Sequence, residues 1–176
     1  MKRGFTLIEI IVVVIILAIA AASAVPYVGN MGSYKSTAAA RIVMSDLFYA
    51  QNYAITAQKT VYVTFTVAEG SANSYKVTDK ADGTGTGVQL PGEGNNWTVT
   101  FGPTASGPLN ATKLSAVKVN GAAATVFGFD SLGQLCDSTG SATTITAAAT
   151  VQVTDSAGKN TVTLTIQPYT GEISVQ

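Results

Sequence analysis

The sequence has no histidine and only one cysteine, Cys136, among its 176 residues. Without histidine the chain lacks the commonest general base and zinc ligand, and a single cysteine cannot form an intrachain disulfide. Charged residues make up 11% of the chain, and ten basic side chains balance ten acidic ones. These shortages exclude Ser-His-Asp and Cys-His enzymes and a protein that coats DNA by general basic charge. We expect no enzyme activity, no cofactor and no metal.

The chain does have one long apolar run, over residues 5–25. As a helix this run would measure roughly 31 Å, enough to cross the hydrocarbon core of a membrane. Its large apolar side chains favour insertion by roughly −4 to −8 kcal/mol, which outweighs a cost of about 3 kcal/mol for its one acid, Glu9. Because Lys2 and Arg3 precede the run, the positive-inside rule predicts a cytoplasmic N-terminus. We therefore expect a single-pass membrane helix with the rest of the chain outside the cytoplasm.

Other kinds of N-terminal segment share this layout. A basic start, an apolar run and the small side chains of Ala22 and Ala24 are typical of a secretory signal peptide, whose removal would leave Val25 first. A plain signal anchor is another alternative. Glu9 disfavours both, because an acid near the start of an apolar run is costly and serves neither purpose. Such an acid predicts a functional partner, with a carboxylate that reaches the membrane surface as the simpler alternative.

The residues from Lys2 to Glu9, KRGFTLIE, resemble the leader and processing site of type IV prepilins and type II secretion pseudopilins. The resemblance implies that a prepilin peptidase cuts after Gly4 and methylates the new N-terminal residue, Phe5. It also implies that the Glu9 carboxylate pairs with the N-terminal amine of a neighbouring subunit during assembly. In a low dielectric such a pair is costly to leave unmade, so it would select one axial register. Pro26 matches the proline that family members carry at the end of the membrane stretch.

The division expected from these features is a leader at residues 1–4, a transmembrane and assembly helix at 5–25, a bend and amphipathic helix at 26–59, and a β-rich head at 60–176. Pro26 and the glycines after it predict a helix break. Between residues 33 and 59, apolar side chains recur on one helix face, which should pack on a sheet. The stripe consists of Ala40, Val43, Leu47, Ala50, Ala54 and Ala57, and the aromatic residues near it, Phe48, Tyr49 and Tyr53, are predicted to be packing edges.

Beyond residue 60 the pattern changes to alternating, Thr- and Val-rich runs separated by Gly and Pro. The predicted fold class is α+β: a long N-terminal helix, membrane-spanning in its first half, packed on an antiparallel sheet or sandwich, as in pilins. The predicted strands are residues 61–67, 75–78, 97–101, 114–119, 125–129, 144–154, 161–167 and 172–175.

Parts of the head resemble the GspH/FimT family of minor pseudopilins and minor pilins. These parts are the helix and first strand at residues 40–65, a strand-end turn at 129–133 (FDSLG), a penultimate strand at 162–166 and a hairpin turn at Thr170-Gly171. Major pilins usually close their C-terminal region with two cysteines, which Cys136 alone cannot do. The resemblance therefore implies a minor subunit, at or near the tip of a filament. A major pilin that lacks the disulfide is the alternative.

Minor pilins of the FimT kind can bind DNA through basic residues just after the C-terminal glycine. Here Gly171 is followed by Glu172, and removal of Lys2 and Arg3 with the leader leaves eight basic side chains against ten acidic ones. Phosphates would gain little from such a surface, so we do not expect nucleic acid as a partner. A DNA-uptake pilin remains an alternative, as does an anchored or released β domain that recognises a ligand through its loops.

The expected partners are other pilin or pseudopilin subunits, the prepilin peptidase and an assembly platform in the inner membrane. The expected location is the inner membrane before assembly, and then a filament in the periplasm or at the cell surface. A type II secretion pseudopilus and a type IV pilus both fit these features.

Four acids and the cysteine are weaker candidates. Asp79 and Asp82 flank a loop as calcium ligands do, but they lack the spacing of an EF-hand, so a turn is favoured. Asp130 and Asp137 could form a carboxylate pair of a hydrolase, although turn capping is the simpler explanation. Cys136 is either a buried apolar side chain or a free thiol, without a cation nearby to make it reactive.

Overall fold

The computed structural model describes residues 6–29, 31–67, 73–88 and 97–176. Gly4 and Phe5, the predicted processing site, lie outside the described residues. The chain divides into two compact units, Met1–Met31 and Gly32–Gln176. From here on the second unit is called the head, so the head includes the helix before residue 60 as well as the β-rich part.

Helix α1 (Leu7–Gly29) forms the first unit. It contains most of the apolar run over residues 5–25, and its long series of aliphatic side chains is compatible with continuous helix. Among the described residues, no helix is both long enough and apolar enough to cross a membrane.

The predicted helix break at Pro26 is not found at that residue. Helix α1 continues through Pro26 and ends at Gly29, and helix α2 (Met31–Ala57) begins two positions later. A proline inside a helix removes one backbone hydrogen bond, which a long helix tolerates at the cost of local distortion. The boundary between the helices therefore falls after Gly29.

Helix α2 confirms the predicted amphipathic helix. Its buried side chains recur at the spacing of one face, and small residues predominate among them, so strands approach the helix closely. Gln58 adopts a left-handed conformation (φ 54°), and the Lys59 N–H donates to the Ala54 carbonyl at 3.1 Å. This geometry ends the helix at Ala57 in a Schellman motif. The buried residues are Ser36, Ala39, Ala40, Val43, Leu47, Ala50 and Ala54, whereas Ala57 is only half-buried.

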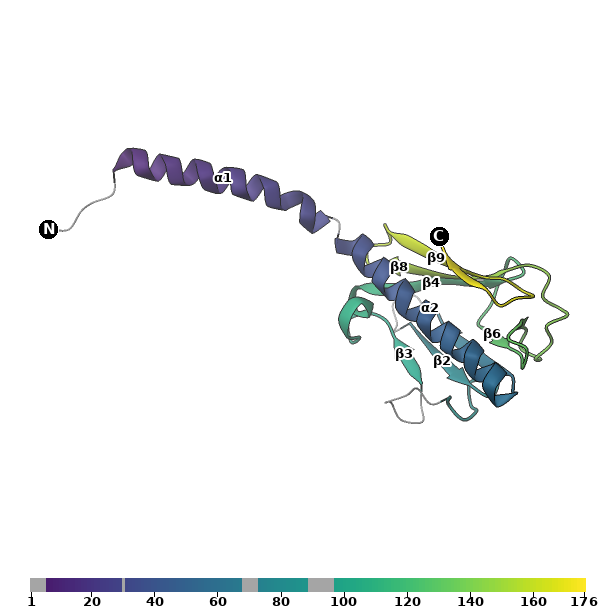
Figure 1. Cartoon of the computed structure of the whole chain (residues 1–176). Coiled ribbons are helices and arrows are strands. Elements are labelled where there is room, and N and C mark those ends of the chain that lie inside the picture. Colours follow the sequence, from purple (N-terminus) through teal and green to yellow (C-terminus); the bar gives the residue numbers. More distant parts are fainter. Residues whose placement is uncertain (1–5, 30, 68–72, 89–96) are drawn as a thin grey trace. The chain divides into compact units, whose positions relative to one another are not determined.

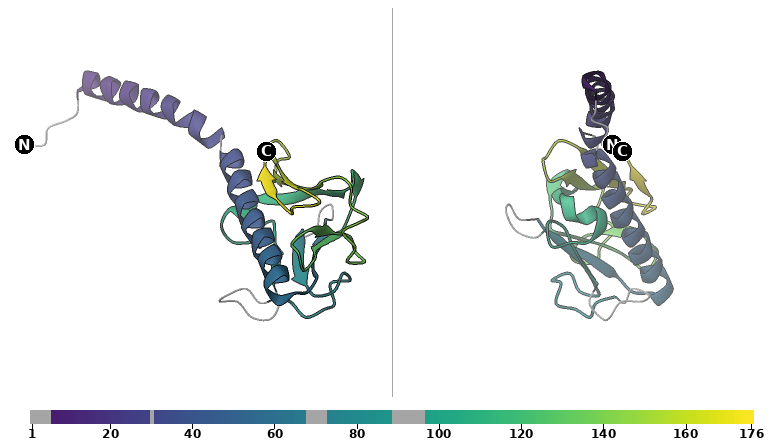
Figure 2. Two further views of the ribbon diagram at one scale, coloured as in Figure 1. Left: turned by 45° about the vertical axis from the view of Figure 1, so that its right-hand side comes forward. Right: turned by 90° about the vertical axis from the view of Figure 1, so that its left-hand side faces the viewer.

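The strands of the head form two five-stranded antiparallel sheets, which lie beside α2 (Figure 1 and Figure 2). Sheet A has the order β3-β2-β1-β6-β7, and sheet B has the order β10-β9-β8-β4-β5. The α+β fold class is thus confirmed. The strands are β1 (Val61–Thr66), β2 (Ser74–Thr78), β3 (Thr98–Thr100), β4 (Thr112–Val119), β5 (Ala122–Ala123), β6 (Val126–Phe129), β7 (Leu135–Cys136), β8 (Ala149–Asp155), β9 (Thr161–Ile166) and β10 (Ile173–Val175), with a 3-10 helix η1 (Gly107–Ala111) before β4.

All eight predicted strands have a counterpart, but the sixth was predicted too long. Strand β8 begins at Ala149, so the prediction is wrong for residues 144–148, which form a loop. Strands β5 and β7 were not predicted, because each has only two residues and shows no alternation. The turn before β5 carries a signal that would have revealed it: Asn120 and Gly121 both have positive φ (52° and 77°), as in a tight Asn-Gly hairpin.

The core of the head is one cluster of apolar side chains from α2 and both sheets. Tyr49 of α2 packs edge-on against the buried Trp97, with ring centroids 5.4 Å apart, which confirms its predicted packing role. The buried Tyr75 donates its hydroxyl to the Asp46 carboxylate on α2. Burial and the Asp46 charge raise the Tyr75 pKa well above its usual value, so the hydroxyl stays protonated and holds α2 to sheet A.

The start of α2 is fixed to sheet B. The Ser36 hydroxyl donates to the Asn160 carbonyl at 3.0 Å, in the turn between β8 and β9. A Cβ at Gly32 would lie 2.5 Å from the Asp155 carboxylate, so a larger residue would have to displace that side chain. Hydrogen bonds from Asn160 and from the Lys159 N–H lower the Asp155 pKa and keep this turn closed.

Gln51, in the second half of α2, joins turns from both sheets. Its side-chain amide donates to the Gly133 carbonyl at 2.8 Å, after β6, and to the Thr170 carbonyl at 3.3 Å, between β9 and β10. A Cβ at Gly171 would lie 2.2 Å from both the Gln51 amide nitrogen and the Gly133 oxygen, and the residue has φ 63°. The two turns singled out by the GspH/FimT resemblance therefore meet at one side chain. We call this arrangement the Gln51 junction.

The Gln51 junction predicts a difference between two glycines. Gly171→Ala should destabilise the head by about 3 kcal/mol, because it combines left-handed strain with a backbone clash. Gly158→Ala is the matched control: Gly158 also has positive φ (74°) but open space around it, so the cost should be about 1 kcal/mol. Urea unfolding of the full chain in detergent, followed through the single buried Trp97, measures both. Equal losses would show that Gly171 is needed only for its backbone conformation.

Candidate functional site

The first candidate site is the start of α1, where Thr6 and Glu9 bond to each other. The Glu9 N–H donates to the Thr6 hydroxyl at 3.3 Å, and the Thr6 N–H donates to the Glu9 carboxylate at 3.4 Å. This reciprocal pair is a capping box, whose Thr-x-x-Glu signature was visible in the sequence but not recognised. The positive end of the helix dipole favours the Glu9 carboxylate in this first turn. Glu9 therefore stabilises its own helix in the free chain.

The second feature of this segment is its apolar surface. Every large aliphatic side chain described in α1 is between 48% and 78% exposed. A continuous aliphatic surface of this kind is unfavourable in water and marks a region that lipid or other protein segments cover. The side chains are Leu7, Ile8, Ile10, Ile11, Val12, Val13, Val14, Ile15, Ile16, Leu17 and Ile19.

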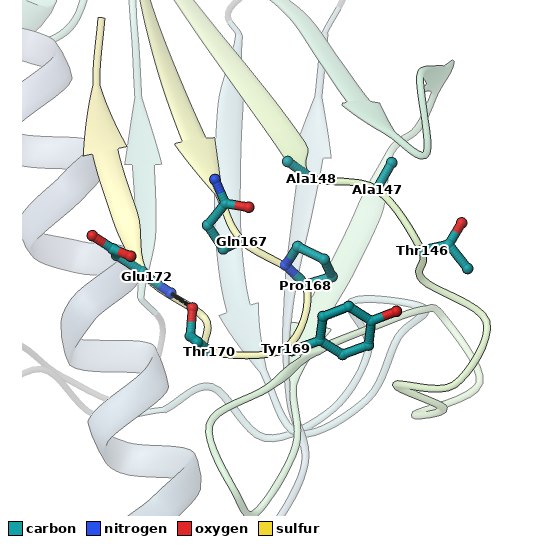
Figure 3. A pocket seen from close by; sticks show the side chains of 8 residues that line it. All are labelled: Thr146, Ala147, Ala148, Gln167, Pro168, Tyr169, Thr170 and Glu172. Atoms are coloured by element: carbon teal, nitrogen blue, oxygen red, sulfur yellow. Dashed lines mark hydrogen bonds between the residues drawn. The ribbon is translucent and has the colours of Figure 1, made fainter.

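A second candidate site lies on the head, at the turn between β9 and β10 (Figure 3). A hollow of about 450 Å³ opens there toward the solvent. Two adjacent alanines leave room on one side, and a proline, a tyrosine and polar side chains form the other. The lining residues are Thr146, Ala147, Ala148, Gln167, Pro168, Tyr169, Thr170 and Glu172.

Four hydrogen bonds fix the walls of this hollow. Asn120 accepts hydrogen bonds from the Thr146 and Ala147 N–H groups at 3.0 and 2.9 Å, which holds the loop before β8. The Leu135 N–H donates to the Pro168 carbonyl at 3.0 Å. The Gln51 junction holds the turn at Thr170. These supporting roles are not predicted from the sequence, although the Asn-Gly pair at residue 120 carries a signal for the first.

Asp130 and Asp137 cap turns, as the simpler explanation predicted. The Asp130 carboxylate accepts from the Leu132 and Gln134 N–H groups, both at 2.9 Å. Partial burial opposes ionisation of Asp137, but hydrogen bonds from Thr139, Thr144 and Ser141 outweigh it and lower its pKa to about 2. Because each carboxylate is engaged in its own turn, the geometry gives no acid-base pair.

Asp82 and Cys136 also have structural surroundings. The Asp82 carboxylate accepts from the Thr84 N–H and hydroxyl at 2.9 and 2.7 Å, which lowers its pKa and forms the favoured turn. In the described ranges, no three His, Cys, Asp or Glu side chains are grouped as metal ligands, around Asp79 or elsewhere. Cys136 is buried and free, and its burial, with the charges of Asp130 and Asp137, raises its pKa to about 12. Its thiol is therefore protonated and inert at neutral pH.

Comparison with known proteins gives one family match. The family model described as the prokaryotic N-terminal methylation motif matches residues 1–25. No curated protein matches the chain. Among solved structures, the chain is similar to the type IV minor pilin FimU of Pseudomonas aeruginosa in two crystal forms. The first is 14% identical, with a TM-score of 0.48, and covers 80% of this chain and 91% of FimU. The second is 15% identical, with a TM-score of 0.47, and covers 80% and 87%. The family match confirms the resemblance to type IV prepilins that was drawn from Lys2 to Glu9.

Proposed function

We propose that the chain is a structural subunit of a pilin-type filament, held in the inner membrane by α1 before assembly. The observation that carries the proposal is the N-terminal methylation motif over residues 1–25. The exposed aliphatic surface of α1 supports it, because that surface needs lipid before assembly and neighbouring subunits afterwards. Lys2 and Arg3 orient the N-terminus toward the cytoplasm, so the head lies outside.

In this proposal a prepilin peptidase cuts after Gly4 and methylates Phe5, and an inner-membrane platform then adds the subunit to a filament. Glu9 has two successive partners. In the free subunit it forms a capping box with Thr6, in which the one bond that its carboxylate accepts is 3.4 Å, long for a hydrogen bond to a carboxylate. In the filament it pairs with the N-terminal amine of a neighbouring subunit, a stronger interaction where water is excluded. Weak capping leaves the carboxylate available for this exchange.

We further propose that the chain is a minor subunit, at or near the tip of a type IV pilus or a type II secretion pseudopilus. The turns at residues 129–133 and at Thr170-Gly171, which the resemblance to GspH/FimT proteins singled out, are joined by Gln51. Because Glu172 follows Gly171, a cation is missing where FimT-like pilins would contact DNA. The proposed partners are therefore protein subunits and not nucleic acid.

The proposal predicts that the mature protein begins with N-methylated Phe5. Intact-mass measurement of the native protein, with sequencing of its N-terminal peptide, should find the first four residues removed and one methyl group added. A mature chain that begins at Val25 would indicate ordinary signal peptidase and would contradict the proposal. An uncut chain would leave only a signal anchor.

The two roles of Glu9 are separable by substitution. Glu9→Gln keeps a hydrogen-bonding side chain for the capping box and removes the charge, whereas Glu9→Leu removes both. Both variants should insert in the membrane at least as well as the wild type, because the costly acid is gone. Both should enter filaments at least about tenfold less, because the charge pair is lost. Immunoblots of sheared filaments beside membrane fractions measure this, and normal incorporation of Glu9→Gln would show that capping, not charge pairing, is what assembly requires.

A further inference from the structure

We propose that the hollow beside the β9–β10 turn is a docking site for a basic side chain, arginine or lysine, of a neighbouring protein subunit. The inference rests on the proposed function, in which the head meets other subunits. It adds the chemistry of one contact between subunits. This contact depends on which residues line the hollow, on their charge and on the hydrogen bonds that hold them in place.

The acceptor groups of the site lie side by side across two strands. The Gln167 N–H donates to the Glu172 carbonyl at 2.9 Å, so these residues face each other at the ends of β9 and β10. Residues that are opposite on antiparallel strands point to the same face, with Cβ atoms about 5 Å apart. The amide and the carboxylate therefore start from one face, although in Figure 3 the Glu172 carboxylate points away from Gln167. Among the described residues no hydrogen bond or ion pair engages the Glu172 side chain, and it is exposed.

The rest of the hollow is apolar and aromatic. Tyr169 is 65% exposed beside the buried Pro168, and the methyl groups of Ala147 and Ala148 form the opposite side. Figure 3 shows Gln167 between Glu172 on one side and Pro168 and Tyr169 on the other. A ring face attracts a cation, and an apolar floor accepts the methylene stem of lysine or arginine. A carboxylate, an amide oxygen and an exposed ring together therefore suit a long basic side chain.

The charge of the hollow selects among other ligands. Of its eight lining residues Glu172 is acidic and none is basic. Phosphate groups of nucleic acid would be repelled by the Glu172 carboxylate. The described residues that line the hollow also include no lysine or arginine to displace the counterions of the phosphates, a displacement that is the main source of affinity for nucleic acid. A neutral sugar would use the ring, the amide and the carboxylate as hydrogen-bond and stacking groups but would leave the charge of Glu172 uncompensated. Only a cation balances that charge.

The walls are held before any partner arrives. Asn120 fixes the loop at Thr146 and Ala147, and Gln51 fixes the turn at Thr170. The Glu172 N–H also donates to the Thr170 hydroxyl at 3.2 Å, which orients the backbone that carries the carboxylate. A site that is already ordered loses little conformational entropy on binding, so a single side chain can be recognised.

The test uses the full chain in detergent micelles and two blocked tripeptides, acetyl-Gly-Arg-Gly-amide and its citrulline analogue. Citrulline has nearly the shape of arginine but no charge. NMR titration of the backbone amides of Ala147, Gln167 and Tyr169 should show binding of the arginine peptide, weaker at 0.5 M salt than at 0.05 M salt. The citrulline peptide should bind at least about threefold more weakly.

Three variants assign the contacts. Glu172→Gln and Tyr169→Ala should each lower the affinity for the arginine peptide by about threefold to tenfold. Asp79→Asn removes an acid that does not line the hollow and should leave binding unchanged. Equal binding of both peptides would overturn the proposal. So would binding of maltotriose or duplex DNA at the same amides with no response to the arginine peptide.

The outcome is separate from that of the proposed function, because the titration needs neither processing nor a filament. In cells, Glu172→Lys should reduce incorporation into filaments while the mature chain still begins at Phe5. Failure of the unsubstituted, correctly processed chain to bind the arginine peptide would reject the docking site alone. An unprocessed chain that still binds the arginine peptide would reject the proposed function alone.

Discussion

The bond network around Gln51 is the constraint on which the arrangement of the head depends. One amide on α2 donates to carbonyl groups of two turns, one after β6 of sheet A and one between β9 and β10 of sheet B. The approach is so close that Gly171 has no room for a side chain. The two sheets have no described strand in common. The junction connects the turn at Gly133 in one sheet to the turn at Thr170 in the other, and both turns to α2. The same junction holds Thr170, one of the residues that line the hollow beside Glu172.

Much of the fold could be predicted from the sequence, for physical reasons that apply to particular elements. One face of α2 is buried, which requires apolar side chains at the spacing of a helix. Residues 40–54 show this spacing, so the buried face is predictable from the sequence. Long strands such as β1 and β9 alternate because only one of their faces is buried. Strands β5 and β7 are too short for any alternation and exist because a turn returns the chain to a neighbour. The loop at residues 144–148 looks like a strand by composition, but the Asn120 side chain accepts the hydrogen bonds of the Thr146 and Ala147 N–H groups.

The candidate sites were predicted unequally. At the N-terminus the short segment from Lys2 to Glu9 was sufficient to predict the methylation motif, because such a motif is a local sequence that needs no tertiary structure to be recognised. The capping role of Glu9 was also local and could have been recognised from Thr6. The hollow could not be found in this way. Its residues come from segments about 20 positions apart, and only the register of β8, β9 and β10 brings them together.

Affinity and register have different sources in the proposed filament. The aliphatic surface of α1 supplies much of the affinity. Apolar contact is non-directional, however, so helices with such surfaces can slide past one another at little cost in free energy. Register must then come from polar groups that are costly to leave unpaired. Glu9 is one such group on α1, and the Glu172 carboxylate offers a second on the head. A contact between different surfaces of two neighbouring subunits is heterologous, so it does not close on itself and is compatible with a helical filament. Two polar contacts that must be satisfied together restrict the allowed positions of a subunit more than either one does alone. Once the first contact has formed, the second forms at a high effective concentration, so two weak contacts can act together.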